Sequence, residues 1–371
     1  MKNGANKKGA LSSRMIREYA EKGFIQNINP ENIRPSSLDL SISDEIYRVQ
    51  GIFQPRPGEK IVDLLKSVEH AKHDLSYPLE KDVMYLAKLE ESLALPKNIY
   101  AYCNPKSSTG RTDTHVRVLT DGISRYDAVP QSGYEGSLWA AITPKSFPIK
   151  ISGGETLSQI RFFNWDTRFS EDDLEKSVKK DKLLWDIFDD RPLDYDELKI
   201  SDRDGSIILT LDLKSKIVGY KCSGSNKILD FSKIKHYSPE DFFEPIVKRN
   251  DHLYLNKGEF YILSTREALR VPPSLSCEMI PMDERSGEFR SHYAGFIDPG
   301  WGWGAKGEGR GRTITLELRP FEDLVVRDKQ PIGKIRFERM IEIPDMVYDK
   351  IGMSNYTSQN GPKLSKHFKT L

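Results

Sequence analysis

The sequence predicts a mainly β protein made of two tandem, jelly-roll-like β-barrels, with a short N-terminal helix and a helical connector between the barrels. Three observations predict this fold. Short segments that alternate apolar and polar residues, separated by Gly, Pro and Asn turns, run from Arg34 to about Phe163, as in small all-β barrels. The composition becomes highly charged between residues 164 and 204. The strand pattern then resumes at about Gly205 and continues to Ile343.

The first predicted element is an amphipathic helix over residues 11–23. Ser12 or Ser13 is a suitable N-cap, because a hydroxyl can accept a hydrogen bond from an amide of the first turn. Gly23 is a suitable stop, because glycine readily adopts the left-handed conformation that ends helices. Alternating segments that begin with PSSLDLSIS at residue 35 follow this helix.

The charged connector predicts a second helix, which begins after Ser170. This serine is followed by the acidic sequence EDD, and acidic residues stabilise the first turn of a helix. Another helical stretch is expected from Leu183 to Phe188. The tail from Tyr348 to Leu371 is polar and is expected to be a mobile end. The predicted domains are a first barrel over residues 1–165, the connector over 166–204, and a second barrel over 205–371.

The two predicted barrels contain the same pattern of residues. Residues 91–100 read ESLALPKNIY, and residues 267–276 read EALRVPPSLS. Each passage is followed by a turn with proline, a small cluster of basic and Ser residues, and an apolar strand. When these strands are aligned, Ala141 of the first copy falls where Glu317 lies in the second. We therefore expect one catalytic half and one half that is kept for binding or assembly.

The overall composition argues against several classes of function. The 371 residues include 56 Lys or Arg and 55 Asp or Glu, and the net charge of +1 provides no global field for nucleic acid or an anionic membrane. No apolar run is long enough for a transmembrane helix. The first ten residues show no secretory signal, so we expect a cytoplasmic protein. The three cysteines stand singly, which predicts neither a disulfide framework nor a structural zinc site.

Several short motifs occur in the order found in one enzyme family. The second half contains MDERSGEFR at residues 282–290, Ala294, IDPGW at 297–301, Glu317, and NYTSQNGPKLS at 355–365. The first half contains PSSLDL at 35–40 and KSSTGR at 106–111. Together these motifs resemble the deoxycytidine triphosphate deaminases, which are trimeric β-barrel relatives of dUTPases. The resemblance implies two dUTPase-like barrels.

The resemblance also implies an activity, the hydrolytic deamination of dCTP to dUTP and ammonia, with Glu317 as general base and proton shuttle. One carboxylate can take a proton from the attacking water and deliver it to the departing amine. A carboxyl in this role needs an enclosed site, and the strand TITLEL is expected to place Glu317 in one. Zinc-dependent base deaminases use HxE and PCxxC motifs, and this sequence has neither. We therefore expect Mg²⁺ only with the substrate triphosphate, and no zinc.

The resemblance further implies a set of substrate-binding residues. Cations, hydroxyls and loop amides of the two Arg-Ser-Ser-like loops would bind the triphosphate: Lys106, Ser107, Ser108 and Arg111, with the counterparts Arg285, Ser286 and Arg290. Ala294 would let the backbone approach the pyrimidine, and Asp298 would contact the sugar, although Asp-Pro-Gly is also an ordinary turn signal. Tyr356 and Gln359 would belong to a C-terminal lid.

The sequence departs from the family pattern at three places. The loop from Arg290 to Ala294 is shorter than usual, and the glycine-rich insert 302–312 lengthens the following hairpin. Phe296 stands where a basic residue is common. The insert lacks the GxxxxGK[ST] order of a P-loop, and we expect a flexible hairpin tip or an interface element. The family builds its sites between barrels, so a site that combines Glu317 of one half with Ser107 and Ser108 of another stays open.

Two barrels in each chain predict a homotrimer, because barrels that assemble in threes then require at least three chains. Two alternatives to a simple deaminase also remain. One is a dUTPase or a bifunctional dCTP deaminase/dUTPase, in which Asp298 activates a water at the α-phosphate. The other is a regulatory protein that binds nucleotide without turnover, which the degenerate first half and the altered loops would suit.

Overall fold

The computed structural model describes residues 7–198, 201–248, 251–291, 295–350 and 359–370. The chain forms two compact units. The first unit comprises residues 1–166, 224–241 and 365–371, and the second comprises 167–223 and 242–364. Both units consist mainly of strands, which confirms the predicted fold class.

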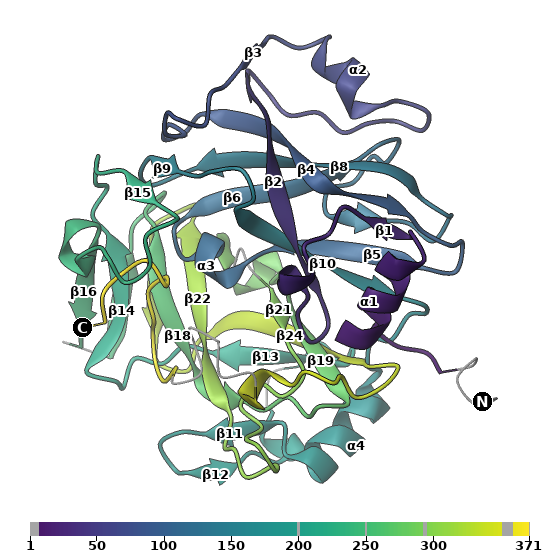
Figure 1. Cartoon of the computed structure of the whole chain (residues 1–371). Helices are drawn as coiled ribbons and strands as arrows, with labels where there is room; N and C mark the ends of the chain where they lie inside the picture. The colour runs from purple at the N-terminus through teal and green to yellow at the C-terminus, as the bar shows by residue number, and fades with distance from the viewer. Residues whose placement is uncertain (1–6, 199–200, 249–250, 292–294, 351–358, 371) are drawn as a thin grey trace. The chain divides into compact units, whose positions relative to one another are not determined.

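The first unit is built on a nine-stranded sheet and a separate pair of strands, β9 and β15. Its strands are β1 (Ile25–Gln26), β2 (Leu38–Val49), β3 (His70–Lys72), β4 (Met84–Ala94), β5 (Tyr100–Pro105), β6 (Thr114–Thr120), β7 (Ala128–Val129), β8 (Glu135–Pro144), β9 (Ile149–Lys150), β10 (Thr156–Phe163) and β15 (Leu229–Asp230). The main sheet runs in the order β6-β8-β4-β2-β10-β5-β7. Figure 1 labels most of these strands. The short helices are α1 (Ser13–Glu21), η1 (Pro30–Asn32), α2 (Ile61–Leu65), α3 (Ser107–Gly110) and η3 (Pro239–Asp241).

Helix α1 begins and ends as the sequence predicts. Ser12 is its N-cap, and the serine hydroxyl accepts a hydrogen bond from the amide of Met15 at 3.3 Å. Gly23 follows the helix with a φ of +76°, a conformation that side chains with a Cβ rarely adopt. The cap and the glycine therefore fix the length of the helix.

The second unit has a corresponding set of strands, divided among smaller sheets. These strands are β11 (Leu184–Asp186), β12 (Arg191–Pro192), β13 (Ser206–Thr210), β14 (Ile217–Cys222), β16 (Phe243–Val247), β17 (His252–Leu255), β18 (Tyr261–Leu269), β19 (Leu275–Ile280), β20 (Phe289–Ser291), β21 (Phe296–Ile297), β22 (Arg312–Pro320), β23 (Leu324–Arg327) and β24 (Pro331–Arg339). One sheet runs β12-β11-β18-β14-β16 and continues from β18 to β22 and β20, and another runs β13-β24-β19-β21. Helical segments are α4 (Glu171–Asp181), η2 (Tyr195–Glu197), η4 (Glu284–Ser286) and η5 (Tyr348–Lys350).

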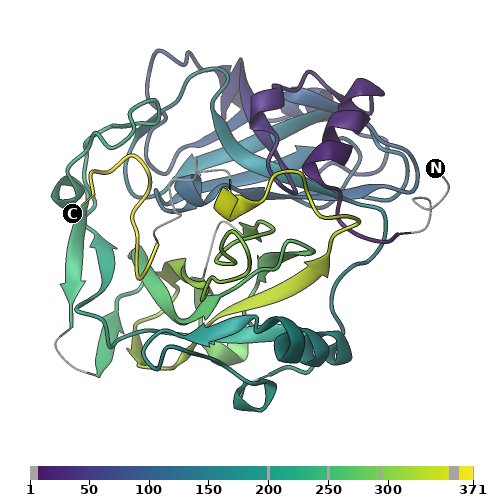
Figure 2. The same ribbon diagram turned by 60° about the horizontal axis from the view of Figure 1, so that its bottom comes forward.

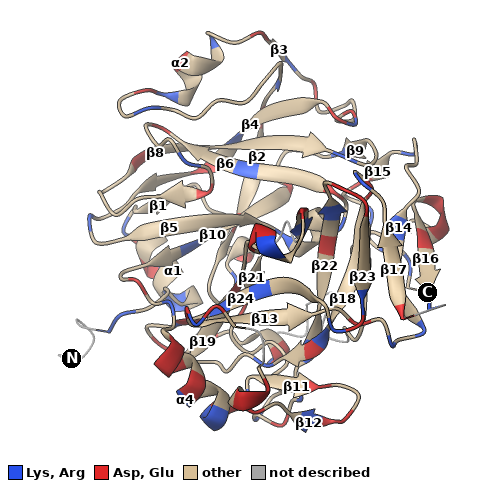
Figure 3. Ribbon diagram, turned by 180° about the vertical axis from the view of Figure 1, so that it is seen from behind, with Lys and Arg blue, Asp and Glu red and all other residues tan. Residues whose placement is uncertain are grey.

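The connector is part of the second unit. Helix α4 begins at a capping box formed by Ser170 and Asp173, and its acidic first turn is red in Figure 3. Leu174 and Val178 on this helix belong to the hydrophobic core of the second unit, so the helix lies against that unit (Figure 2). The expected helix from Leu183 to Phe188 is wrong. Residues 184–186 form β11, which pairs with β18, because long-range pairing overrides local propensity in so short a segment.

Two segments from beyond the connector belong to the first unit. Strand β15 pairs in parallel with β9, which brings residues 224–241 into the first unit rather than the second. Phe368 of the tail forms a β-bridge with Tyr237 in that same segment. The expectation of a mobile end is wrong for the described residues 359–370. Gln359 is 3% exposed and His367 is fully buried.

Candidate active site

Strand β22 presents two chemically different faces. Ile314, Leu316 and Leu318 belong to the hydrophobic core of the second unit. Successive side chains of a strand point to opposite faces, so Thr313, Thr315 and Glu317 share the other face. These three side chains are polar, yet none is more than 1% exposed. The strand therefore carries a buried row of two hydroxyls and one carboxyl.

The strand pairing shows which residue of the first unit corresponds to Glu317. Glu317 lies opposite Ile262 of β18, five residues before Glu267. Ala141 lies opposite Leu86 of β4, five residues before Glu91. Both pairings also contain a register shift at the same place, between Lys88 and Ser92 in one unit and between Ser264 and Ala268 in the other. Strand register thus places Ala141 at the position of Glu317.

Hydrophobic side chains fill the corresponding face of the first unit. Trp139 and Ala141 belong to a buried cluster that includes Ile61 and Leu65 of α2. The amide of Ile61 donates a hydrogen bond of 2.8 Å to a carboxylate oxygen of Asp121, which holds the start of α2 over this cluster. Where the second unit has the Thr315 hydroxyl and a carboxyl, the first has an indole and a methyl group. This face thus has an alanine where the second unit has its carboxyl.

Glu91 and Glu267 form the same contact in both units. The carboxylate of Glu91 accepts the amide of Ser41 with both oxygens, at 3.1 and 2.9 Å. The carboxylate of Glu267 accepts the amide and the hydroxyl of Thr210, at 2.8 and 2.5 Å. Burial raises the pKa of Glu91 to about 7 and also raises that of Glu267. Since the unit without Glu317 keeps this contact, its role is in the fold rather than in the reaction.

The loop at residues 106–111 is packed into the first unit. Its four residues 107–110 form α3 after the N-cap Lys106. The ammonium group of Lys106 lies 2.6 Å from both a carboxylate oxygen of Asp39 and the hydroxyl of Thr156. Ser108 is 8% exposed and Arg111 only 3%. The Lys106 ammonium is therefore held by two contacts, and Ser108 and Arg111 are buried in this predicted phosphate loop.

In the second unit, strand register gives the loop residues different counterparts from those that the sequence predicted. The sequences IRFF at 160–163 and IRFE at 335–338 are equivalent. Ile160 pairs with Cys103 in the first unit, and Ile335 pairs with Met279 in the second. Counted from these pairs, Met282 is the counterpart of Lys106. We predicted that Arg285 and Ser286 are the counterparts of Lys106 and Ser107. They lie three residues further along the loop than the true counterparts, Met282 and Asp283. The hydroxyls of the first loop have acidic residues as counterparts in the second, Asp283 and Glu284.

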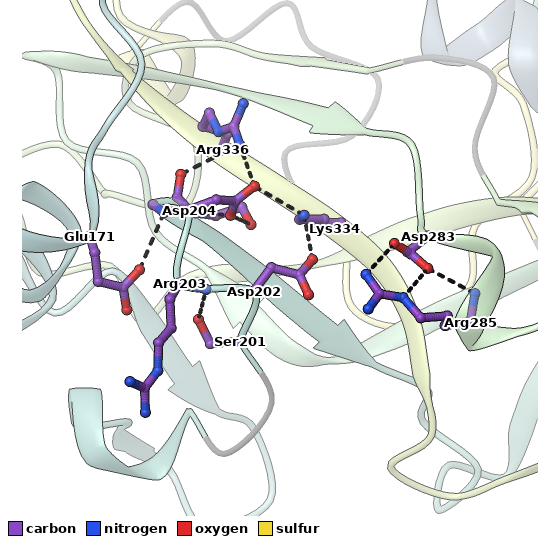
Figure 4. A network of polar contacts seen from close by, with 11 residues as sticks. Glu171, Ser201, Asp202, Arg203, Asp204, Asp283, Arg285, Lys334 and Arg336 are labelled. Atoms are coloured by element: carbon purple, nitrogen blue, oxygen red, sulfur yellow. Dashed lines mark hydrogen bonds and ion pairs between the residues drawn. The ribbon is translucent and has the colours of Figure 1, made fainter.

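Arg285 forms an ion pair within its own loop. Its guanidinium donates to both oxygens of Asp283 at 2.7 Å, although the arginine side chain is 81% exposed. This hydrogen bonding keeps the pKa of Asp283 well below its ordinary value. Figure 4 shows this pair beside another ion-pair network, in which Lys334 contacts Asp202 at 2.5 Å and Asp204 at 3.2 Å.

That network joins the start of β13 to β24. Arg336 pairs with Asp204 at 2.6 Å, and the hydroxyl and amide of Ser206 also hydrogen-bond to Asp204. Burial alone raises the pKa of Asp204, but the hydrogen bonds from Ser206 and Lys334 outweigh it and lower the pKa to about 2. Asp204 therefore stays ionised. Lys334 and Arg336 are thus committed to structural carboxylates (Figure 4).

The other predicted binding residues of the second unit have different surroundings. Asp298 begins a turn in which its carbonyl accepts the amide of Trp301 at 3.2 Å, and Gly300 has a φ of +90°. Its backbone thus forms the ordinary Asp-Pro-Gly turn. Arg290 lies in β20 opposite Arg319. Ala294 and Tyr356 lie outside the described residues.

The C-terminal segment, defined here as Gln359–Lys363, contacts the polar face of β22. The side-chain amide of Gln359 donates to the carbonyl of Thr313 at 2.7 Å. The backbone amide of Gly361 donates to the Thr313 hydroxyl at 2.8 Å, and that of Lys363 to the Thr315 hydroxyl at 3.2 Å. The sequence pattern did not single out these threonines. Their alternation with Glu317 in TITLE was the available signal.

The glycine-rich insert is held by several contacts within the second unit. The Arg270 guanidinium lies 3.7 Å from the centre of the Trp303 ring and donates to the carbonyl of Gly309 at 2.8 Å. The amide of Gly304 donates to the carboxylate of Asp349 at 2.8 Å. These contacts define the conformation of the insert, so the expected flexible hairpin tip does not describe it. Arg270 has no basic counterpart in the first unit, where Ala94 holds its place.

Two further observations concern ligands and membranes. Among the described residues, no three His, Cys, Asp or Glu side chains come together as a group that could hold a metal ion. Within the same part of the chain, no helix is long and apolar enough to cross a membrane.

The chain matches two family models and one solved structure over most of its length. Residues 7–166 match the 2'-deoxycytidine 5'-triphosphate deaminase N-terminal domain, and residues 180–368 match the C-terminal domain. The crystal structure of 2'-deoxycytidine 5'-triphosphate deaminase from Agrobacterium tumefaciens is similar with a TM-score of 0.82 and 35% sequence identity. That similarity covers 92% of this chain and 100% of the other.

Two curated proteins are similar over a shorter part of the chain. The dCTP deaminase of Metallosphaera sedula is 25% identical over 154 residues, which are 41% of this chain and 83% of the relative. A protein of Methanothermobacter thermautotrophicus described as dCTP deaminase, dUMP-forming, is 28% identical over 160 residues, 41% of this chain and 77% of the relative.

Proposed function

The chain belongs to the 2'-deoxycytidine 5'-triphosphate deaminase family, and on that premise we propose that Glu317 is its catalytic residue. The protein is an enzyme that deaminates dCTP by hydrolysis. The observation that carries it is the buried carboxyl of Glu317 on β22, on the face opposite the hydrophobic core.

The chemistry requires one group that both accepts and donates a proton. Water adds to C4 of the cytosine ring while the carboxylate of Glu317 takes one of its protons. The same carboxyl then protonates the amine on C4, the C4–N bond breaks, and ammonia leaves. The hydroxyl that remains on C4 gives its proton to ring N3, and its oxygen becomes the carbonyl of uracil. An enclosed site suits this shuttle, because excluding bulk water prevents the proton from being lost between the two steps.

The first unit supports the assignment of Glu317 because it has no carboxyl at the corresponding position of its strand. It keeps the strand register, the register shift and the buried Glu91 contact, but it has Ala141 and Trp139 on the corresponding face. We therefore propose one catalytic site per chain, with its carboxyl supplied by the second unit. Binding of dCTP to the enzyme in solution tests this number, and one nucleotide per chain is the expected result.

The substrate-binding residues remain the set that the family resemblance predicts. We propose that the Arg-Ser-Ser-like loops bind triphosphate through their cations and hydroxyls. The residues are Lys106, Ser107, Ser108 and Arg111 in the first unit, and Arg285, Ser286 and Arg290 in the second. The base and sugar would be contacted by Ala294 and Asp298, and the lid would use Tyr356 and Gln359. The first loop has the stronger support, because Asp39 and Thr156 hold its Lys106 ammonium in place and a binding group held in place loses little entropy when the ligand arrives.

Mg²⁺ would enter with the triphosphate, as its preference for phosphate oxygens and water allows. Removal of Mg²⁺ with a chelator is expected to weaken dCTP binding. The expected assembly is a homotrimer, and a sedimentation measurement that finds a stable monomer or dimer would refute it. The cytoplasm is the compartment that the sequence predicts.

The enzyme could release either dUTP or, after a second hydrolysis, dUMP and pyrophosphate. A relative described as dUMP-forming motivates a bifunctional enzyme that also releases pyrophosphate. In that case a second water attacks the α-phosphate, and Asp298 is the candidate to orient it. We propose dUTP as the released product.

One product analysis separates these functions. The enzyme is incubated with dCTP and Mg²⁺, and ammonia, dUTP, dUMP and pyrophosphate are followed together. Ammonia and dUTP in equal amounts support the proposal. Pyrophosphate and dUMP in amounts equal to ammonia establish the bifunctional reaction, with Asp298→Asn as the variant that should then restore dUTP. Binding of dCTP with no product would refute both.

A further inference from the structure

The polar face of β22 carries the proposed catalytic carboxyl and also binds the C-terminal segment. Thr313, Thr315 and Glu317 lie at every second position of one strand, and two residues of a strand span about 7 Å. The segment Gln359–Lys363 is hydrogen-bonded to Thr313 and Thr315. Its last hydrogen bond to β22 is therefore made one position before Glu317 on the same face.

The contacts advance along the strand and the segment in equal steps. Gly361 is paired with Thr313, and Lys363, two residues later, is paired with Thr315. The backbone amides of the segment donate to side-chain hydroxyls rather than to strand carbonyls, and residues 361–363 are not part of a strand. Two hydroxyl groups thus hold residues 361–363 beside β22, and the Gln359 side chain adds a hydrogen bond to the Thr313 carbonyl.

The first unit lacks this pair of hydroxyls. By the strand register, Ser137 and Trp139 are the counterparts of Thr313 and Thr315. The hydroxyl of Ser137 is used locally, since it accepts a hydrogen bond from the indole of Trp139 at 3.3 Å. The unit that has Ala141 in place of Glu317 thus also lacks the second hydroxyl.

We propose that Thr313 and Thr315 are positioning residues of the deaminase, whose hydroxyls hold the C-terminal segment closed over the strand that carries Glu317. This inference rests on the proposed role of Glu317. The segment bound in this position encloses the nucleotide and excludes water from the carboxyl during turnover. A threonine here acts through the segment and does not itself touch the reacting atoms.

The conservative substitutions Thr→Val and Thr→Ser separate the hydroxyl from the rest of the side chain. Thr313→Val and Thr315→Val keep the shape and remove the acceptor, while Thr313→Ser and Thr315→Ser keep the acceptor. Each lost hydroxyl is expected to raise the KM for dCTP by about tenfold and to lower kcat by a smaller factor. The serine variants should keep the wild-type KM. Ser137→Ala, at the corresponding place in the first unit, is the matched control and should change neither constant.

Hydrogen exchange of the peptide that contains residues 359–364 gives a readout that does not need activity. The amides of Gly361 and Lys363 should exchange at least about tenfold faster in each corresponding valine variant and at the wild-type rate in the serine variants. Gly361→Ala tests the same contact independently, by changing the C-terminal segment instead of the threonines. Its φ is +81° and nothing lies within 4 Å of an added Cβ, so the change strains the backbone of the segment without a clash, and it should also raise KM.

The outcomes distinguish this inference from the proposed function. Valine variants with wild-type KM and unchanged exchange would overturn the role of the hydroxyls. A serine variant that behaves like the valine variant would do the same, because the acceptor would then not be the group that matters. If the valine variants do not fold, the serine and Gly361→Ala variants still decide the question. If the wild-type enzyme releases no ammonia from dCTP, the proposed function fails, whereas the exchange data still report on the segment.

Discussion

Ala141 and Glu317 occupy the same position in the two units. On the neighbouring strand, each lies opposite a residue that is followed five positions later by a buried glutamate, Glu91 or Glu267. The equivalence is set by hydrogen-bonded strand register and by a shared register shift, so it does not depend on how the loops are aligned. One duplicated strand has thus kept its carboxyl, and the other has joined a hydrophobic cluster.

Restoring the carboxyl to the first unit is not expected to create a second site. Ala141→Glu places a carboxyl beside Trp139 and Leu86, and burying a charge without a partner destabilises a fold by several kcal/mol. The expected result is a lower unfolding temperature of the first unit, measured by calorimetry, with a smaller decrease for Ala141→Gln. The double variant Ala141→Glu, Glu317→Gln should release no ammonia. Activity of that variant would show that the first unit still has a usable site.

The stability of the first unit should depend on pH through Glu91. Burial raises the pKa of this carboxyl from 4.5 to about 7, so the folded state favours the protonated form. Below about pH 4.5 both folded and unfolded chains hold the proton. As the pH rises to about 7 the unfolded chain releases it more readily, and the folded state loses about 3 kcal/mol.

Glu91→Gln removes this titration while keeping a side-chain oxygen that can accept the Ser41 amide. The difference in unfolding temperature between the variant and the wild type should therefore increase in favour of the variant from pH 4.5 to pH 7.5. Thermal unfolding at several pH values checks this. A difference that stays constant or decreases would mean that Glu91 is ionised at low pH in the folded protein.

The loop of the first unit should contribute to dCTP affinity. Replacing Ser107 and Ser108 together by alanine removes two hydroxyls, and we expect KM for dCTP to rise by about ten- to one-hundredfold. The unfolding temperature should change little, because the contact from the Ser365 hydroxyl goes to the Ser108 carbonyl at 2.8 Å and survives the substitution.

Ser286→Ala is the matched variant in the loop of the second unit. We expect it to raise KM by a smaller factor, because that loop places acidic residues at the corresponding positions and already pairs Arg285 with Asp283. Steady-state kinetics on both variants makes the comparison. An unchanged KM for the Ser107, Ser108 variant would remove the first unit from the substrate-binding set.

The sequence predicts those features that depend on neighbouring residues. Ser12 and Gly23 define the first helix through a cap and a left-handed glycine, and the Ser170 capping box begins α4. The β-branched sequence TITLEL predicts the strand that buries Glu317. These signals are local, so one sequence is sufficient to find them.

Features that depend on distant partners could not be predicted in the same way. Leu183–Phe188 has a helical composition, but pairing with β18 makes residues 184–186 a strand. Residues 359–370 have the composition of a mobile tail, yet hydroxyl groups of Thr313 and Thr315 bind part of it. The counterpart of Lys106 could be found only by counting from paired strands, because the loops themselves differ in length. Local composition contains no information about such partners.

The most direct test of the central claim is the deamination rate of Glu317→Gln at saturating dCTP, measured together with the dissociation constant for dCTP. Glutamine keeps the size of the side chain but cannot accept a proton from water, so kcat should fall by at least about a thousandfold, while dCTP binding stays within severalfold of the wild type. A variant that keeps a substantial part of the wild-type kcat would contradict the assignment of Glu317 as the catalytic residue.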